Sequence, residues 1–443
     1  GLDHTTTLIK AIRSERGDDK VLLLDGGDTW QGSYTSLKTQ GADMVEVMRA
    51  LGTEAMVGHW EFTFGQDRLK ELIDKLGYPF LGGNVFDTEW DEPVFESTAF
   101  FEKGGVSIAV IGQHFPYTPI ANPSYMVEGW SFGIRPEVLQ KNVNKAKKQG
   151  AEIVVLLSHN GFDVDQKLAA MINGIDVILT GHTHDAIPKG IRIKDTLLLS
   201  SGSHGKYLGR VDLKVKNGKV VDTSSNLIPV FSDIIPPDPD MTKMINEIRA
   251  PYQDECDRAI GETETLLYRR GNFNGSWDDV ICNTIMQERD TEISLSPGFR
   301  WGTTLLPGQK ITIDDIYSQT SMNYPEVYRI EMTGKMIKEL LEDVCDNIFN
   351  PDPFFQQGGD MVRVGGLTYT CHPKNKIGNR ISDLRMISSG KTIESNKKYV
   401  VGGWGSVNPN VKGPAIYNLL ENYISEKKII KKSNLEAVKI VGM

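Results

Sequence analysis

Short apolar segments alternate with amphipathic segments over the first 230 residues. Leu8, Ile9 and Ile12 recur at helical spacing within residues 5–16, which predicts an amphipathic helix. The same spacing predicts helices at 43–51, 66–76, 137–149 and 168–172. Apolar runs predict strands at 21–24, 108–111, 153–157, 177–179 and 196–200. Apolar strands between amphipathic helices are typical of an α/β sheet that is covered on both faces.

A proline-rich acidic stretch follows this region. Residues 229–240 contain four prolines, which predicts an extended linker. The next segment, 241–260, is largely helical in pattern, and Pro251 is expected to break or kink it. We therefore expect a first α/β domain over 1–230, a connecting segment with a helix over 231–260, and a second, α+β domain over 261–443.

Polar residues with metal-ligating side chains follow several predicted strands at the point where each strand ends. These residues are Asp28, His159, His182 and His184. Sites in open α/β sheets form beyond the carboxyl ends of the strands, so we expect the clusters to converge. His59 lies in a further glycine-flanked turn. Any one of these histidines could be a hydrogen-bonded turn residue, but the whole set predicts a divalent-metal site.

The charge balance narrows the possible partners. Lys plus Arg number 49 and Asp plus Glu 58, which gives a net charge of −9. This balance argues against nucleic acid or an anionic membrane as partner. No apolar run of about 18 residues predicts a membrane span. The four cysteines show no metal-binding spacing; they can be buried free thiols, or form a disulfide if the protein is exported.

The ordered motifs resemble those of a known family. They are Gly-Asp-x-x-Gln-Gly at 27–32, Ser-His-x-Gly at 158–161 and Gly-His-x-His at 181–184. This set resembles the calcineurin-like metallophosphoesterases, and most closely their 5′-nucleotidase branch, over nearly the whole chain. The resemblance implies an N-terminal metallophosphoesterase-type sandwich, with sheets flanked by helices, and a second α+β domain of the 5′-nucleotidase C-terminal type.

The resemblance also implies a dinuclear centre. Asp28 would bridge two divalent metal ions, with one site completed by His59, His159 and His182, and His184 in the other. The family's second site also uses an Asp-x-His motif from the first strand. Asp3-His4 lacks that spacing and lies where a helix is expected to begin. We therefore expect the motif to lie upstream of Gly1 and the second site to be incomplete in this chain.

Two positions depart from the nucleotidase pattern. Trp60 and Thr63 stand where that branch has the His and Asp of an acid dyad, and neither can protonate a leaving alkoxide. General acid catalysis is worth about 10²–10⁴-fold, so we expect a leaving group that needs no proton, such as a thiolate or persulfide. The nucleotidase aromatic clamp is not recognisable at 401–408. The family's arginine is retained as Arg300, a planar donor suited to a tetrahedral oxyanion.

These departures resemble the SoxB family of thiosulfohydrolases. Further stretches that fit are 271–278, 322–326 and 350–363. The resemblance implies a periplasmic enzyme with two manganese ions, although Asp and His ligands suit manganese, zinc or iron alike. It would hydrolyse the sulfonate from a cysteine S-thiosulfonate on the SoxYZ carrier protein and release sulfate. The candidate catalytic residues are Arg300, Asp360, Arg363 and Trp60, the last either a pocket wall or a core indole.

Two other functions fit the same residues. A phosphomonoesterase or 5′-nucleotidase could use the same metal centre. A non-catalytic carrier-binding subunit could keep a degenerate metal fold, although the retained ligands argue against it.

Overall fold

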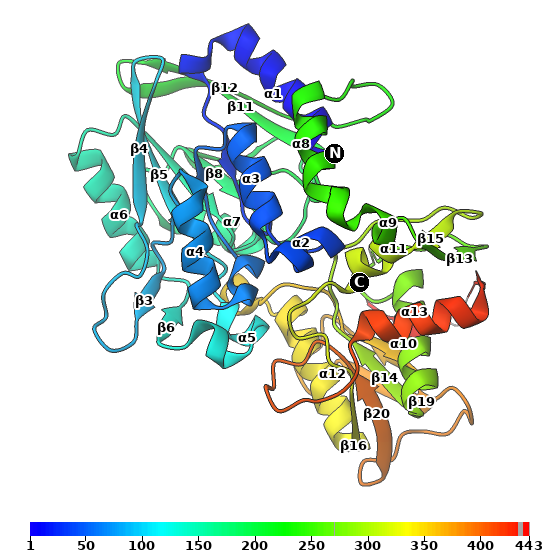
Figure 1. Ribbon diagram of the computed structural model, residues 1–443. Helices are drawn as coiled ribbons and strands as arrows, with labels where there is room; N and C mark the ends of the chain where they lie inside the picture. The colour runs from blue at the N-terminus through cyan, green and yellow to red at the C-terminus, as the bar shows by residue number, and fades with distance from the viewer. Residues whose placement is uncertain (270, 433–436, 443) are drawn as a thin grey trace. The chain divides into compact units, whose positions relative to one another are not determined.

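The computed structural model of the protein describes residues 1–269, 271–432 and 437–442. The chain forms two compact units (Figure 1). Unit 1 contains Gly1–Gln31 and Lys38–Pro251, and unit 2 contains Gly32–Leu37 and Tyr252–Met443. Within the described ranges, none of the helices has the length and hydropathy needed to span a bilayer.

The centre of unit 1 is a six-stranded mixed sheet with the order β4-β5-β7-β8-β10-β9. Its strands are β4 (Thr98–Lys103), β5 (Val106–Gln113), β7 (Ile153–Ser158), β8 (Val177–Thr180), β9 (Ile191–Ile193) and β10 (Thr196–Ser200). The four central strands are parallel, and the edge strands β4 and β9 are antiparallel to their neighbours. The four parallel strands match the apolar runs from which they were predicted.

The other strands of unit 1 form three smaller ladders, β1–β2, β3–β6 and β11–β12. They are β1 (Leu24–Asp25), β2 (Ala55–Met56), β3 (Val85–Asp87), β6 (Trp130–Phe132), β11 (Tyr207–Lys216) and β12 (Lys219–Pro229). The helices are α1 (Leu2–Arg16), α3 (Ala42–Leu51), α4 (Gln66–Leu76), α5 (Thr118–Ala121), α6 (Pro136–Lys148), α7 (Phe162–Met171) and α8 (Pro239–Arg249). A further helix, α2 (Tyr34–Thr39), begins in the short segment of unit 2.

The main sheet is covered on both faces, as the sequence pattern predicts. All six residues of β7 are buried. Ile153, Val155 and Leu157 pack with apolar residues of the β11–β12 hairpin, and α6 and α7 pack against the central strands. Alternate strand residues point to opposite faces, so a strand buried at every position must be sandwiched.

Two predicted elements differ in the structure. The strand expected at 21–24 is reduced to Leu24–Asp25. The segment 241–260 is not helical throughout, because α8 is followed by a 3₁₀ turn at Ala250–Tyr252, a short α9 (Gln253–Cys256) and a strand that begins at Ala259. Pro251 lies in that turn, as expected for a residue that cannot continue a helix. Helix α8 packs with α1 and α3 through Met241 and its neighbours.

In its described residues, unit 2 contains three small sheets and their helices. The strands are β13 (Ala259–Thr263), β14 (Ile293–Ser296), β15 (Lys310–Thr312), β16 (Tyr328–Thr333), β17 (Arg363–Gly365), β18 (Leu367–Cys371), β19 (Ile381–Met386), β20 (Lys398–Gly403), β21 (Ile429–Ile430) and β22 (Val438–Ile440). The longer helices are α10 (Ser276–Arg289), α11 (Ile313–Thr320), α12 (Gly334–Phe349) and α13 (Ile416–Lys427).

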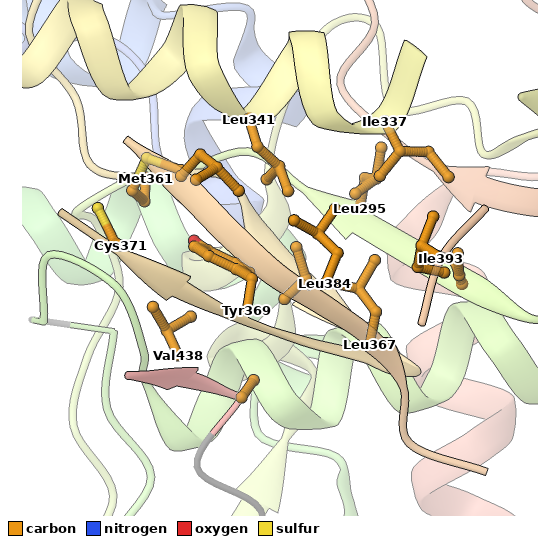
Figure 2. Close-up of a cluster of buried hydrophobic side chains, with 14 of the residues drawn as sticks. Leu295, Ile337, Leu341, Met361, Leu367, Tyr369, Cys371, Leu384, Ile393 and Val438 are labelled. Carbon is orange, nitrogen blue, oxygen red and sulfur yellow. The ribbon is translucent and has the colours of Figure 1, made fainter. Parts of the chain in front are cut away.

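The core of unit 2 lies between α12 and the strands beneath it. Ile337 and Leu341 point from α12 towards Leu295 of β14 and the β18 strand (Figure 2). Tyr369 of β18 belongs to the same apolar cluster and is also buried. Thr333 caps the first turn of α12 by accepting a hydrogen bond from the Met336 backbone N–H, which satisfies one of the free helix donors.

Candidate functional site

Four side chains from four strand exits meet at one point in unit 1. They are Asp28 after β1, His59 after β2, His159 after β7 and His182 after β8. Each offers one ligand atom, and these atoms all lie within 4.8 Å of one another. Since β1 pairs with β2 and β7 with β8 in parallel, each pair delivers its loops to one sheet edge. The structure thus brings together four of the five predicted metal ligands.

The loops hold these side chains in an uncommon backbone conformation. Asp28 has φ +64°, His182 φ +72° and His184 φ +61°, in the left-handed region that non-glycine residues rarely adopt. Such strain persists where the surroundings enforce it, often at functional sites. Gly27 lets the first two loops approach closely, because a Cβ there would lie 2.7 Å from the carbonyl oxygen of Val57.

Asp28 and His159 face each other in a geometry that calls for a cation. The Nδ1 of His159 is within hydrogen-bonding distance of the Gly26 carbonyl oxygen, which can only accept, so Nδ1 must carry a proton. The Nε2 atom lies 3.0 Å from the Asp28 Oδ2. When the imidazole is neutral and protonated at Nδ1, its Nε2 is an acceptor, as is the Asp28 oxygen. A proton or a metal ion must therefore lie between Nε2 and Oδ2. A backbone carbonyl that fixes the outer nitrogen is typical of metal-ligating histidine.

Glu61 links the Asp28 and His59 loops through hydrogen bonds to their backbones. Its side chain is fully buried, and its carboxylate accepts the backbone N–H groups of His59 at 2.7 Å and Thr29 at 2.6 Å. It also accepts the Asp28 N–H at 3.3 Å. Burial and the neighbouring Asp28 carboxylate raise the pKa of Glu61 to about 7. Glu61 therefore holds two ligand loops in register through their main chains.

A second buried acid supports the His159 loop. Asp165, at the first turn of α7, accepts hydrogen bonds from the Ser158 hydroxyl at 2.9 Å and the Asn160 amide at 3.1 Å. These residues flank His159 on both sides in the chain. Burial raises the pKa of Asp165 to about 6, against the hydrogen bonds that lower it. Like Glu61, it orders a ligand loop without being one of the clustered ligands.

Aromatic rings pack against the imidazoles. Phe115 stacks on His182 with ring centroids 4.2 Å apart and lies 4.1 Å from His59. Trp60 also stacks on His59, with ring centroids 4.5 Å apart. Phe115 is buried, whereas Trp60 is partly exposed. Trp60 therefore borders the cluster, and Phe115 fixes the orientation of two candidate ligands.

His184 lies outside the four-residue group and pairs with a different histidine. Its ring centroid is 5.8 Å from that of His204, which also has a positive φ, +58°. His4, the alternative ligand left unassigned above, places its Nδ1 2.7 Å from the Ile235 carbonyl oxygen. This contact fastens α1 to the segment before α8.

The donor set fits a divalent cation. One carboxylate and three imidazoles are ligands that manganese, iron and zinc accept, and all four residues are at most slightly exposed. His59, His159, His182 and Asp28 would hold one ion, and His184 would contribute to a second. Bound ions of this kind lower the pKa of water and offset negative charge on a tetrahedral group.

The three predicted residues of unit 2 belong to a buried chain of alternating charges that includes two residues not predicted. Its members, in order, are Arg269, Asp278, Arg363, Asp360 and Arg300, of which Arg269 and Asp278 are the additions. The successive nitrogen–oxygen distances are 2.9, 3.2, 3.1 and 3.8 Å. Only the last side chain, at 15% exposed, reaches beyond the interior, whereas that of Arg363 is 2% exposed. Arg363 therefore supports Asp360, which in turn lies against Arg300.

Around the candidate ligands of unit 1, the supporting residues Glu61, Asp165 and Phe115 were not predicted from the sequence. The sequence contained a signal for Glu61, because it lies between two aromatic residues next to a candidate ligand. A carboxylate in such an apolar setting requires hydrogen-bond donors in the interior. Asp165 follows the predicted ligand loop of His159 closely in the sequence. An acidic residue in the first turn of a helix is usually exposed to solvent, so its sequence context did not indicate a buried role. Phe115 had no signal, since an aromatic residue after an apolar strand is ordinarily part of the core.

Comparison with known proteins places this geometry in a family. Residues 259–405 match the model of the 5′-nucleotidase C-terminal domain. The sulfate thiohydrolase SoxB of Thermus thermophilus superimposes with a TM-score of 0.96 and 36% identity, over 100% of this chain and 83% of that one. The chain belongs to the SoxB branch of the 5′-nucleotidase family. It is a hydrolase of that family.

Nucleotidases are more distant relatives of this SoxB-branch chain. The 5′-nucleotidase of Bos taurus is 27% identical over 97% of this chain and 83% of its own length. The 5′-nucleotidase of Diplobatis ommata is 25% identical over 65% of this chain, and the match spans 54% of that protein. The structural match to SoxB and the match to the 5′-nucleotidase C-terminal domain confirm the predicted architecture of two units with sheets flanked by helices.

Metal affinity of this SoxB-branch protein is expected to rise with pH. Burial opposes a charge on His159, but Asp28 outweighs it and raises the pKa of the imidazole above 6.5 in the metal-free protein. Below that pKa the Nε2 proton competes with the metal, and above it the nitrogen is free to ligate. Titration calorimetry with Mn²⁺ should give tighter binding at about pH 8 than at about pH 6, with fewer protons released. Equal affinity at both values would contradict this coupling.

Replacing Glu61 with glutamine is expected to weaken metal binding by about 10–100-fold. The amide keeps the size of the side chain but directs an NH₂ group at backbone donors that require an acceptor. Metal content after dialysis, measured by elemental analysis, reports the loss. The matched control is Glu71→Gln, an exposed residue of α4 paired with Arg68 and Lys75. Wild-type metal retention by the Glu61→Gln protein would show that the loops are ordered without the carboxylate.

Proposed function

We propose that this chain hydrolyses a cysteine S-thiosulfonate on a SoxYZ-type carrier protein and releases sulfate. Water adds to the terminal sulfone sulfur, the bond between that sulfur and the carrier-bound sulfur breaks, and the latter leaves as a persulfide anion. The products are sulfate, the carrier persulfide and two protons. The relative of known structure with 36% identity is itself described as a sulfate thiohydrolase.

The observation that carries the proposal is the indole beside His59. By the family resemblance, Trp60 stands at the position of the nucleotidase acid, and its ring stacks on His59 with centroids 4.5 Å apart. Thr63, the other dyad position, is buried at 1% exposed. Neither group supplies a proton at neutral pH, whereas a ribose alkoxide needs one to leave. A persulfide anion leaves unprotonated, so this site suits a sulfur leaving group.

The residues of the chain have separate tasks in this reaction. Asp28 and the clustered imidazoles would hold the cations, for which we propose manganese. The bound cations would supply an activated hydroxide and neutralise sulfonate charge. Glu61 and Asp165 keep the ligand loops ordered. By the family resemblance, Arg300 donates to the sulfonate oxygens, while Arg363 and Asp360 hold its guanidinium in place.

The cellular setting belongs to the same proposal. A carrier-bound thiosulfonate of bacterial sulfur oxidation is processed in the periplasm, so we propose that location and the SoxYZ carrier as partner. The net charge of −9 supports a protein partner over nucleic acid.

The direct test compares two substrates on the same protein. Sulfate release from thiosulfonated carrier and phosphate release from AMP are measured with and without added Mn²⁺, with unmodified carrier as the blank. We expect manganese-dependent sulfate release and AMP hydrolysis at least about 10²-fold slower. AMP hydrolysis at a comparable rate would favour the nucleotidase function instead, and no turnover of either substrate by metal-loaded protein would favour a non-catalytic subunit.

Restoring an acid should shift the balance between these substrates. Trp60→His is expected to raise AMP hydrolysis by up to about 10-fold, a fraction of the full general-acid effect because Thr63 leaves the dyad incomplete. Trp60→Phe is the matched control, since it keeps an aromatic ring without a proton to give. Equal AMP rates in the two variants would mean that the missing acid does not limit phosphate ester cleavage.

A further inference from the structure

Two buried thiols of unit 2 lie in contact, although they are far apart in the sequence. Cys345 belongs to α12 and Cys371 ends β18. Their Sγ atoms are 3.5 Å apart, and both residues are 0% exposed. A disulfide has a sulfur–sulfur distance of about 2.0 Å, so the sulfurs need to approach by only about 1.5 Å to bond.

The surrounding core holds the two thiols against each other. Cys371 lies on the same strand as Tyr369, beneath the α12 helix that carries Leu341 (Figure 2). Both cysteines belong to this one apolar cluster, so packing favours their approach. The thiolate is the form of a cysteine that attacks a disulfide.

We propose that Cys345 and Cys371 form a disulfide bond when the chain folds in an oxidising medium. With glutathione disulfide as oxidant, the Cys371 sulfur attacks one glutathione sulfur and releases the other glutathione as a thiol. The Cys345 sulfur then attacks Cys371 in this mixed disulfide and releases the second glutathione. The two cysteine thiols lose two protons and two electrons, which the glutathione disulfide gains. Because both thiols are buried, the exchange belongs to the folding of unit 2.

The bond would close a loop that contains part of the series of buried ion pairs in unit 2. Residues 346–370 lie between the two cysteines and include Asp360 and Arg363. A cross-link restricts the unfolded chain more than the folded one and so stabilises the fold. The bond would fasten both ends of the segment that supports Arg300. This inference is independent of the reaction proposed above.

The test refolds the full chain from denaturant in a buffer of reduced and oxidised glutathione. Free thiols are alkylated under denaturing conditions and counted by mass spectrometry, and the cross-link is located by peptide mapping. We expect two of the four thiols to be lost, in a linked pair of Cys345 and Cys371 peptides. The oxidised protein should melt roughly 5–10 °C above the same protein treated with reductant.

Two serine variants make the result specific. Cys256→Ser, at a buried thiol outside the pair, should lose two of its three thiols and keep the reductant-sensitive shift in melting temperature. Cys371→Ser should keep all three of its thiols and show no such shift. Refolded wild-type protein that retains four alkylated thiols, or that pairs different cysteines, would overturn the proposal without bearing on the hydrolase reaction.

Discussion

Replacing His159 with alanine is expected to lower the proposed sulfate release by more than about 10³-fold, because the substitution removes both a candidate metal ligand and the partner of Asp28. The Nε2 atom of His159 is 3.0 Å from Asp28. Desolvation raises the pKa of this carboxylate, but the three imidazoles together outweigh it and hold the pKa well below its ordinary value. Loss of one imidazole leaves an incomplete cluster around Asp28. Metal content and initial rate, measured on the same preparation, report the two consequences.

His372→Ala is the matched control for this substitution. His372 lies in unit 2, with Nε2 3.1 Å from the Ser382 hydroxyl, outside the metal cluster. Its removal should leave metal content and rate within about twofold of the wild type. A His159→Ala protein that keeps both its metal and its rate would remove this cluster from the reaction.

The positions of the candidate ligands were predictable because parallel strands impose them. β5, β7, β8 and β10 are apolar at most positions, without the polar alternation of a half-exposed strand, a pattern typical of strands buried on both faces. Once strands are assigned, the residues after them must lie at a common edge. Histidines after two neighbouring strands were therefore expected to converge, and His159 and His182 do so.

The support beneath the ligands could not be predicted in the same way. Glu61 acts through backbone N–H groups of two loops, and no side-chain pattern records where those groups point. Phe115 stacks on two imidazoles, but its sequence context is that of any core residue. Periodicity reports which face of an element is buried, whereas these contacts depend on how loops from separate elements meet.

The sequence of unit 2 gave a weaker indication of where its site residues lie. Its strands are short, several are only two or three residues long, and its sheets are mixed, so no edge rule locates a site. Arg300, Asp360 and Arg363 were identified by family resemblance. The structure adds Arg269 and Asp278 to them and reveals that only one end of the series reaches the surface.

Replacing Asp278 with asparagine is expected to lower the free energy of unfolding of unit 2 by about 3–5 kcal/mol. Asp278 lies between two buried guanidinium groups, with Arg269 at 2.9 Å and Arg363 at 3.2 Å. All three side chains are at most 2% exposed. The amide keeps the shape of the carboxylate but leaves two buried cations without their shared counter-charge. Urea unfolding, followed by tryptophan fluorescence at neutral pH, measures the change.

The adjacent residue provides the control that separates pairing from simple loss of an acid. Burial and then the charge of Asp278 raise the pKa of Asp279 to about 6. An acid with a raised pKa in the folded state costs stability when it is ionised. This cost begins as the pH rises above the ordinary pKa of aspartate and is complete once the pH exceeds the raised pKa. Asp279→Asn should therefore keep or increase stability near neutral pH, whereas Asp278→Asn should lose it. Equal effects of the two substitutions would show that the buried arginines do not depend on Asp278.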